Sequence, residues 1–343
     1  MKNEAETYRV VSGYDNINRS QWSDFVSRHS DGTIFQTPEY YEIHLNAKGF
    51  RPHAIAAYDS ENNIAGIMVA VISHVYGGVL NYLTSRAVIA GGPLVRNNDA
   101  EIALRLLQAF RANKKIKVIY SQFRNLFDVG NLKSAFEKAG AKYEDHLNIH
   151  IDVLQSEDGL WKGVKSRKRN QIRQAQRKGL TVSEMVSDEA VKKTYPILEE
   201  VYSHAKLPLA DNSLFSNAYR LMNPKKMLRI YGVFQGEELV GTMYIFSFNG
   251  RFYDWYAGSF RQHYSSYPND ILPWEIFRNA QAEGMTLFDF GGAGKPGVAY
   301  GVRDYKMQFG GELVNFGRYE LAHNRCIFAL AQQGFKIWQK IRK

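Results

Sequence analysis

A glycine-rich segment late in the chain carries the residues best suited to chemistry. A predicted buried strand ends at Phe290, and five glycines follow it up to Gly301. Glycine permits positive φ and lets backbone N–H groups approach a ligand closely. The segment then presents Arg303, Tyr305 and Lys306, which are side-chain types that bind phosphate or a developing oxyanion. The pattern predicts a site for an anionic group, although a glycine-rich turn is also a common structural connection.

A second candidate is a basic helix predicted over residues 159–178, with Asp158 as its N-cap and Gly179 as its end. Between Lys162 and Lys178 there are eight basic residues and no acid. Cations crowded on a few turns repel one another, which favours a bound polyanion, and a merely solvated basic helix is the alternative. We expect the stem of Lys168 to join a narrow buried stripe. The cations expected to contact RNA or phosphate are Lys165, Arg167, Lys168, Arg169 and Arg173.

Other signatures of catalysis or metal binding are missing from the sequence. It has no G-x-S-x-G elbow and no GxxxxGK[ST] loop, so nucleotide hydrolysis is unsupported. The single cysteine, Cys326, has no obvious partner. His146 and His150 share one face of a predicted strand, but residues four apart on a strand lie roughly 13 Å from each other. We therefore expect no metal site.

Four segments resemble motifs of the FemABX family, the aminoacyltransferases that build peptidoglycan bridges. The segment 288–311, FDFGGAG…YGVRDYKMQFGG, resembles the closing signature of that family. Residues 161–180 resemble its basic helix, W-x-x-x-x-x-K-x-R-x-x-I-R-x-A-x-x-x-G. Weaker matches are residues 35–40, similar to a Q-[ST]-x-x-aromatic motif, and residues 253–259, similar to the strand before the last helices. These matches occur in the order of the family.

The resemblance implies an α/β (α+β) fold of two tandem GNAT-like acyltransferase domains, with mixed sheets flanked by helices and no coiled-coil arm. In the family, an aminoacyl-tRNA delivers an amino acid to an amine on a cell-wall precursor. The resemblance places Lys306 and Tyr305 on the side of the tRNA ester. We assign catalysis to Lys306, Tyr305, Tyr256 and Asp289, and substrate binding to Gln36, Tyr40, Arg303, Gly291 and Gly292.

Such a reaction needs little side-chain chemistry, because the donor is activated and the nucleophile is an amine. We expect Lys306 to stabilise negative charge, the alternative being a surface lysine paired with Asp304 or Glu312. Tyr256 and Tyr305 either relay protons, line the acyl pocket or pack in the core. Asp289 is a general base or, as we favour, an acceptor that anchors the glycine loop.

The chain departs from the family on the acceptor side. Members that bind a UDP-linked muropeptide carry a basic residue after the motif glutamine, where this chain has Glu42 and His44. They also use basic and aromatic residues before a helix of the second domain, where residues 210–215 read ADNSLF. These departures favour a different acceptor amine, for example on an envelope sugar.

Elements that hold these residues recur along the chain. Residues 53–73 and 229–248 each read as a strand, a polar turn and a strand entered through a glycine. An amphipathic helix and a short buried strand follow each, at an offset of about 170–175 residues, which indicates a tandem duplication. We expect one domain over residues 1–155 and a second over 156–343, the latter with the basic helix and a C-terminal amphipathic helix.

The charge of +10 is concentrated in two places, the basic helix and the tail after residue 320. The tail reads as an amphipathic helix with a basic end that packs on the second domain or docks on an anionic membrane. The N-terminus lacks the apolar region of a secretion signal, and no run reaches the ~18 apolar residues of a membrane helix. One cysteine indicates a reducing compartment. We expect a cytoplasmic protein, with membrane contact at the inner face as an alternative.

Three functions remain open from the sequence. The first is transfer from aminoacyl-tRNA to an amine of an envelope precursor such as that of peptidoglycan. The second is acyl-CoA-dependent N-acylation, for which no clear Q/R-x-x-G-x-G/A signature is present. The third is a non-catalytic RNA- or membrane-binding module. In the first two, the aminoacyl-tRNA or acyl-CoA is a co-substrate, and no resident cofactor is expected.

Overall fold

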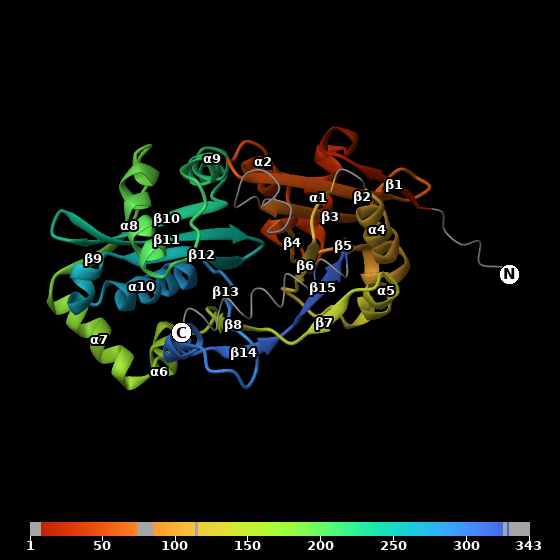
Figure 1. The fold of residues 1–343 in the computed structure, drawn as a ribbon. Coiled ribbons are helices and arrows are strands. Elements are labelled where there is room, and N and C mark those ends of the chain that lie inside the picture. The colour runs from red at the N-terminus through yellow and green to blue at the C-terminus, as the bar shows by residue number, and fades with distance from the viewer. Residues whose placement is uncertain (1–7, 74–84, 114–115, 325–327, 329–343) are drawn as a thin grey trace. The chain divides into compact units, whose positions relative to one another are not determined.

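The computed structural model describes residues 8–73, 85–113, 116–324 and 328. The chain divides into two compact units (Figure 1). The first comprises residues 1–145 together with 316–343, and the second comprises residues 146–315. Each unit has its own sheet, covered by helices on both faces.

The first unit is built on a mixed sheet in the order β1-β2-β3-β4-β6-β15-β7, and the short β5 also pairs with β3. Its one parallel pair among the described strands is β4 with β6. The strands are β1 (Arg9–Ser12), β2 (Phe50–Tyr58), β3 (Ile64–Ser73), β4 (Arg86–Ala90), β5 (Leu94–Val95), β6 (Tyr120–Arg124), β7 (Lys142–Glu144) and β15 (Arg318–Ala322).

Helices α4 (Ala100–Ala112) and α5 (Lys133–Lys138) cover one face of this sheet, and α1 (Arg19–Arg28) and α2 (Pro38–Leu45) pack on the other, over β2 and β3. Helices α1, α2 and α4 each begin at an N-cap whose side chain accepts a backbone hydrogen bond, as when the Asp99 carboxylate accepts from the first turn of α4. The apolar face of α4 is buried against the sheet.

The second unit has a sheet in the order β14-β8-β13-β12-β11-β10-β9, in which only β12 and β13 run parallel among the described strands. Its strands are β8 (Leu147–Asp152), β9 (Leu180–Glu184), β10 (Leu228–Gln235), β11 (Glu238–Phe248), β12 (Arg251–Ser259), β13 (Leu287–Gly292) and β14 (Glu312–Asn315). Helix α10 (Pro268–Ala282) covers one face with α6 (Glu157–Gly163) and α7 (Ser166–Arg177), while α8 (Ala190–His204) and α9 (Asn212–Met222) cover the other. Aromatic and aliphatic side chains fill the core under α10.

The two sheets repeat the same arrangement. The series β2, β3, β4, α4, β6 corresponds to β10, β11, β12, α10, β13 in order and in strand direction. In both, three antiparallel strands lead into a helix that returns to a parallel strand. The structure therefore has the mixed α/β architecture in two copies that the sequence predicted.

The division between the units differs from the expected boundary at residue 155. Strand β8 pairs with β13 and β14 of the second unit, so that unit begins at His146. Strand β15, which follows the second unit in the chain, pairs with β6 and β7 of the first. The unit that β8 and β15 each join is decided by backbone pairing with strands distant in the sequence. The order of residues along the chain does not reveal such pairing.

The predicted basic helix differs in detail. The helix expected over 159–178 is two helices, because Val164 and Lys165 are extended and the Lys165 N–H donates to the Gln308 carbonyl at 2.8 Å. The cap of α6 is Ser156, not Asp158. In the second unit, α8 continues through Pro196.

Among the described residues, none forms a helix with the length and apolar character needed to cross a bilayer. The predicted C-terminal amphipathic helix lies outside the described residues, apart from Phe328.

Candidate active site

Strands β12 and β13 separate at the centre of the candidate site. They pair from Arg251 opposite Leu287 to Tyr253 opposite Asp289, and the parallel register ends there. Asp254 and Phe290 follow at the point of separation. Parallel strands that part in this way leave backbone carbonyl and N–H groups without a strand partner, so another group must satisfy them.

Lys306 fills this separation. It is the last residue of α11 (Gly301–Lys306), and its Nζ donates to Asp254 Oδ2 at 3.0 Å and to the Phe290 carbonyl. The ammonium also lies 5.2 Å from the centre of the Phe290 ring. The side chains of Lys306 and Asp254 are only 14% and 11% exposed. Lys306 is thus held inside the site by Asp254, rather than paired at the surface with Asp304 or Glu312.

Tyr305 lies beside Lys306 and is fixed by its hydroxyl. The hydroxyl donates to the Asn269 carbonyl, and the ring packs edge-on against Phe309 at 5.4 Å. Burial raises the pKa of Tyr305 well above its ordinary value, and the carboxylates of Asp270 and Asp254 raise it further. The phenol therefore stays neutral, which supports a positioning or pocket-lining role over that of a proton acceptor.

Lys168 was expected to contact RNA, and the structure corrects this assignment. Its side chain is buried, its ammonium pairs with Asp270, and it lies 4.6 Å from the ring centre of Tyr305. Burial raises the pKa of Asp270, and Lys168 opposes that rise. Helix α7 packs on α10 at this point, so the Lys168 ammonium is enclosed and does not face solvent. It contacts the ring of Tyr305 instead.

Asp289 anchors the glycine loop. It is buried, and its Oδ1 accepts hydrogen bonds from the Gly291 N–H at 2.7 Å and from Asn148 Nδ2 at 3.5 Å. His150 Nε2 lies 3.5 Å from Oδ2. The φ of Gly291 is +73°, a conformation that favours glycine. This geometry supports the anchoring role of Asp289 and gives no indication of a general base.

Arg303 holds the same loop from the other side. Its guanidinium donates to the carbonyls of Ala293 at 3.3 Å, Lys295 at 2.9 Å and Val298 at 2.5 Å. These three bonds use three of the five N–H donors of the guanidinium and give Arg303 a structural role in the loop, and its contact with substrate stays a prediction. Gly292 ends β13 and is exposed beside the loop.

Tyr256 belongs to an aromatic cluster next to Asp254. A bulge at Trp255 shifts the pairing of β12 with β11, and the Tyr256 ring then packs against Phe215 at 4.8 Å and Tyr202 at 5.5 Å. Burial raises the pKa of Tyr202, and the neighbouring Tyr256 and Asp254 raise it further. The half-buried Tyr256 therefore forms part of an aromatic wall beside the lysine–aspartate pair.

The remaining cations of the basic helix fall into two groups, one bonded within the protein and the other exposed to solvent. Arg169 caps the end of α6, since its Nη1 donates to the carbonyls of Trp161, Lys162 and Val164. Three predicted RNA-binding residues, which we name the α7 cations, are exposed at or near α7 and form no ion pair within the described residues: Lys165, Arg167 and Arg173.

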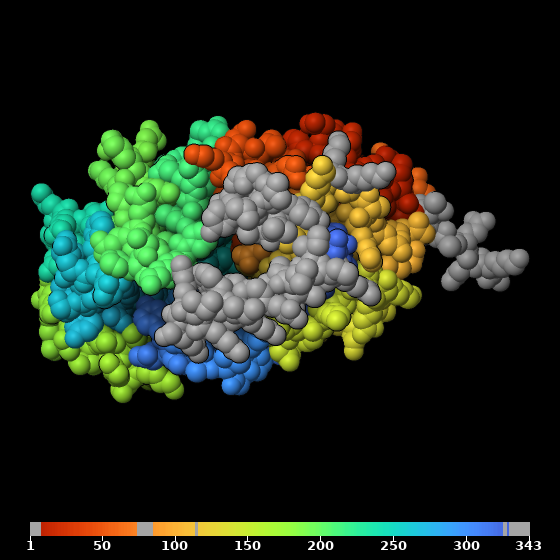
Figure 2. All heavy atoms as spheres, in the orientation of Figure 1, coloured from red at the N-terminus to blue at the C-terminus, as the bar shows by residue number. Residues whose placement is uncertain are grey.

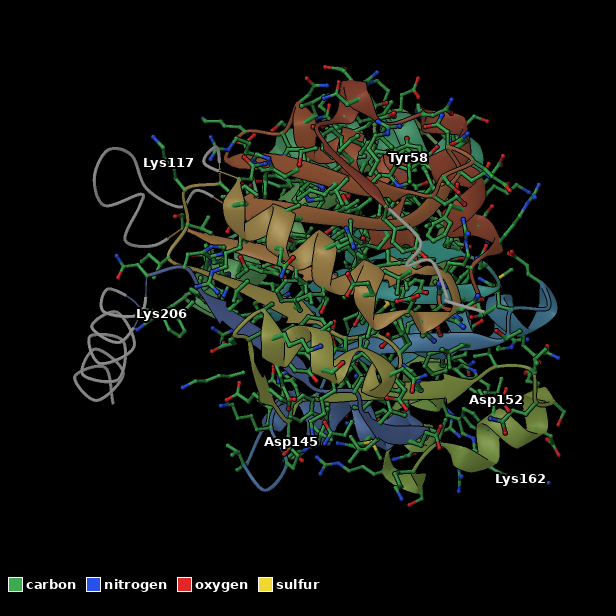
Figure 3. The ribbon with its side chains drawn as sticks, turned by 90° about the vertical axis from the view of Figure 1, so that its right-hand side faces the viewer. Tyr58, Lys117, Asp145, Asp152, Lys162 and Lys206 are labelled. Carbon is green, nitrogen blue, oxygen red and sulfur yellow. The ribbon has the colours of Figure 1, made fainter. Side chains whose placement is uncertain are left out.

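These helices lie at the surface of the second unit. The yellow-green atoms at the lower left of Figure 2 belong to this part of the chain. Lys162, labelled in Figure 3, projects outward from α6. The α7 cations are therefore available to a polyanion.

Gln36 and Tyr40 lie in the first unit. Gln36 has no exposed surface, and its amide completes the sheet by accepting from the Val69 N–H at 2.8 Å and donating to the Ala90 carbonyl at 2.7 Å. This corrects its assignment as a substrate ligand, because the sheet occupies its polar atoms. Tyr40 is half-buried and packs against Phe35 at 5.3 Å.

The two positions that depart from the family also have local roles. Glu42 accepts hydrogen bonds from Arg19 Nε at 2.7 Å and from the Tyr14 hydroxyl at 2.5 Å. His44 is buried, and burial lowers its pKa to about 4. A neutral imidazole and a paired carboxylate do not replace the missing basic residue.

Asp254 and Asp270 belong to the site but were not predicted from the sequence. Asp254 is an acid within an aromatic strand, FYDWYAG, which is an unusual place for a carboxylate and was a usable signal. Asp270 lies in the first turn of α10, where an acid is ordinary, so nothing in the sequence distinguished it.

Comparison with known proteins identifies the fold. Residues 166–307 match the model of the acetyltransferase (GNAT) domain family. The crystal structure of FemX matches 93% of this chain and 99% of its own, with 15% identity and a TM-score of 0.72. A tandem GNAT protein from the clavulanic acid biosynthesis pathway matches 93% of this chain and 99% of its own, with 10% identity and a TM-score of 0.54. The L-PGS structure from Bacillus licheniformis matches 92% of this chain and 96% of its own, with 12% identity and a TM-score of 0.57. No curated protein matches the sequence.

These findings confirm the predicted resemblance at the level of fold. The chain shares its fold with FemX and with the tandem GNAT protein, and its second unit contains the matched acetyltransferase domain.

Proposed function

We propose that this chain, an acyltransferase with the tandem GNAT fold of the FemX kind, transfers an aminoacyl group from aminoacyl-tRNA to an amine of a cell-envelope precursor. The observation that carries the proposal is the position of Lys306 between the separated strands β12 and β13, bonded to Asp254 and to the Phe290 carbonyl.

The chemistry follows from the donors of Lys306. The acceptor amine attacks the ester carbonyl and forms the new C–N bond, and the carbonyl oxygen becomes an oxyanion. The carbonyl then re-forms as the ester C–O bond breaks, and the proton lost by the amine ends on the ribose oxygen of the tRNA, which leaves as a hydroxyl. An ammonium has three N–H donors, and two of them are used by Asp254 and Phe290. The third is left for the developing oxyanion, which a fixed cation in a partly desolvated site stabilises strongly. An activated ester requires no metal ion or prosthetic group for this step.

The α7 cations support a polyanionic donor. Exposed arginine and lysine side chains bind nucleic-acid phosphates mainly by electrostatics. Their helix is in direct contact with the site, because Lys168 of α7 lies against Tyr305. A tRNA held along α7 would bring its acylated end toward Lys306.

An acyl-CoA donor is the second candidate, since the matched family model is that of an acetyltransferase domain. A CoA pyrophosphate would need free backbone N–H groups at the start of a helix such as α10. The segment before α10, residues 260–267, contains no glycine, and Lys178 Nζ donates to the Ser265 carbonyl at 2.6 Å. This local structure favours tRNA over CoA.

The acceptor and the location complete the proposal. We propose an amine of an envelope precursor, with peptidoglycan precursors and envelope sugars as the two classes to be tested. The reaction would take place in the cytoplasm or at the inner face of the membrane, where charged tRNA is present.

The proposal is tested by supplying the purified protein with radiolabelled aminoacyl-tRNA and with preparations of amine-bearing precursors. We expect labelled product that disappears after RNase treatment, and loss of product in Lys306→Met. Lys192→Met is the matched control, because Lys192 is an exposed lysine of the same unit. Transfer that resists RNase and requires acyl-CoA would reject the tRNA donor. Absence of transfer with every donor would favour a non-catalytic binding module.

A further inference from the structure

A buried lysine lies beside the segment that carries Lys306. Lys168 of α7 pairs with Asp270 of α10, and the two side chains are only 4% and 11% exposed. Helices α7 and α10 pack side by side there (Figure 1). Because so little of the ammonium reaches the surface, it is not available to RNA phosphates. Neither RNA contact nor the proposed mechanism therefore accounts for this buried cation.

Lys168 contacts the residues on both sides of Lys306 through aromatic rings. Its ammonium lies 4.6 Å from the ring centre of Tyr305 and 5.1 Å from that of Phe309. These two residues are four apart, in α11 and in the short helical turn that follows it, so their side chains share one face. Lys306 lies between them in the sequence and points instead to Asp254. The segment is therefore held by Lys168 on one face and by Asp254 on another.

The first turn of α10 fixes Tyr305 from a second direction. The Tyr305 hydroxyl donates to the carbonyl of Asn269, and the next residue, Asp270, holds the Lys168 ammonium. The phenol and the cation over its ring are thus held by adjacent residues of one helix. A hydroxyl bond alone leaves a ring free to tilt, whereas a cation close to the ring restricts its orientation.

Stability alone does not require a cation at this position. A buried ion pair is usually no more stable than apolar side chains of similar size, because burial removes the hydration of both charges. A methionine would pack against the same two rings and make favourable sulfur contacts with them. A cation differs in being attracted specifically to the face of a ring. This difference favours orientation of the rings as the role of Lys168.

We propose that Lys168, held by Asp270, is a positioning residue that fixes the ring of Tyr305 and thereby the ammonium of Lys306; its effect on catalysis rests on the proposed function. Because Lys168 is enclosed, it acts on the rate of the chemical step and leaves the affinity for tRNA unchanged. The exposed α7 cations are expected to show the opposite pattern, a loss of tRNA affinity.

The test removes the pair without leaving an unpaired charge, in the pair variant Lys168→Met/Asp270→Leu. Single-turnover transfer at saturating aminoacyl-tRNA should fall at least about tenfold, the order of one desolvated contact between a cation and a ring. The Kd for tRNA should stay within about twofold of wild type, since no exposed phosphate contact is lost. If this variant does not fold, Lys168→Gln/Asp270→Asn keeps a polar pair without charge and carries the same expectation.

The same unit offers a matched control at the other end of α10. Arg229 pairs with Glu283, which follows α10, and its guanidinium lies 5.2 Å from the ring centre of Phe252. Arg229→Met/Glu283→Leu removes an ion pair and a ring contact of the same kind, but none from the candidate site. We expect it to keep the wild-type single-turnover rate. The rates are compared at a temperature at which circular dichroism shows every variant to be folded.

The position of Lys306 is also measured without any transfer. In protein labelled with ¹⁵N-lysine, the ammonium signal of Lys306 is identified by its absence in Lys306→Met. In the pair variant this ammonium should exchange its hydrogens with water faster than in wild type, because its contacts with Asp254 and the Phe290 carbonyl loosen. The control should keep the wild-type exchange rate.

The outcomes separate positioning from the alternatives. A pair variant that keeps more than half of the wild-type rate, or an equal loss of rate in the pair variant and the control, would overturn the proposal. A rise of the tRNA Kd in parallel with the loss of rate would make Lys168 an RNA contact and reject it too. Unchanged exchange at Lys306 would show that the pair does not hold this residue. If wild type transfers from no donor while exchange at Lys306 responds as expected, the proposed function fails and the positioning of Lys306 stands.

Discussion

Replacing Lys306 with methionine tests both the chemistry and the packing of the candidate site. The change removes the ammonium that contacts Asp254 at 3.0 Å and the Phe290 carbonyl, and it keeps most of the side-chain volume. Asp254 then remains as a carboxylate that is 11% exposed and has lost this partner.

Two magnitudes follow. Breaking a buried ion pair by removing one partner costs about 3–5 kcal/mol. Since both side chains keep some contact with solvent, we expect about 2 kcal/mol here, or about 4–8 °C in the melting temperature of a unit of this size. Loss of one oxyanion donor lowers the rate by about 10²–10³. Activity should therefore fall far more than stability can explain.

The double variant Lys306→Met/Asp254→Leu separates the two effects. It removes both charges, so we expect melting close to that of wild type, while transfer of the labelled aminoacyl group stays at the level of the single variant. Melting is followed by circular dichroism, and transfer is measured under single-turnover conditions at saturating tRNA. If Lys306→Met kept more than half of the wild-type rate, or if the double variant recovered activity together with stability, the catalytic role of Lys306 would be refuted.

Other predictions address the remaining parts of the structure. Lys168→Met leaves Asp270 buried without its cation and should cost about 3–5 kcal/mol in unfolding free energy, which Lys168→Met/Asp270→Leu should largely restore. Gln36→Leu leaves buried backbone groups of two strands without partners and should cost about 2–4 kcal/mol, with no recovery on adding substrate; a variant as stable as wild type would contradict the bridging role. Replacing all three α7 cations with glutamine should weaken tRNA binding and reduce the slope of log K against log salt by about 2; an unchanged slope would remove α7 from the RNA interface. Burial lowers the pKa of His44 from 6.5 to about 4, so the unfolded chain takes up the proton first. Stability from this group is present above about pH 6.5 and is lost as the pH falls toward 4, by up to about 3 kcal/mol. His44→Gln should flatten that part of the stability profile in urea titrations.

Helices and strands were predicted well where a hydrophobic pattern within the segment itself determines them. The two segments read as strand, turn and strand, residues 53–73 and 229–248, form β2 with β3 and β10 with β11. The repeated hairpins and helices predicted two copies of one architecture, because each copy buries its own sheet and therefore keeps its own pattern. The basic helix and the glycine-rich loop were also located correctly.

Partners across the fold were not predictable in this way. Burial of the Lys168 stem was expected from the sequence, but its contact with Tyr305 was not. Arg169 is of the same residue type as two of the α7 cations, yet it caps α6. Gln36 was predicted to bind substrate. In the structure its amide lies between β3 and β4 and bonds backbone groups of both strands, where the strands do not bond each other directly. Asp254 belongs to the site because the pairing of β12 with β13 ends next to it, which depends on a strand far away in the sequence.

The sequence by itself determined the fold class, the duplication and the segments that carry charge and glycine, since these depend on periodicity and composition along the chain. The tertiary structure decided which cations face solvent, which carboxylate holds Lys306, and which unit each of β8 and β15 joins. The physical reason is the same in each case. Burial and pairing are properties of residues brought together from distant positions, and a side chain's charge acts according to the neighbours and solvent that this arrangement gives it.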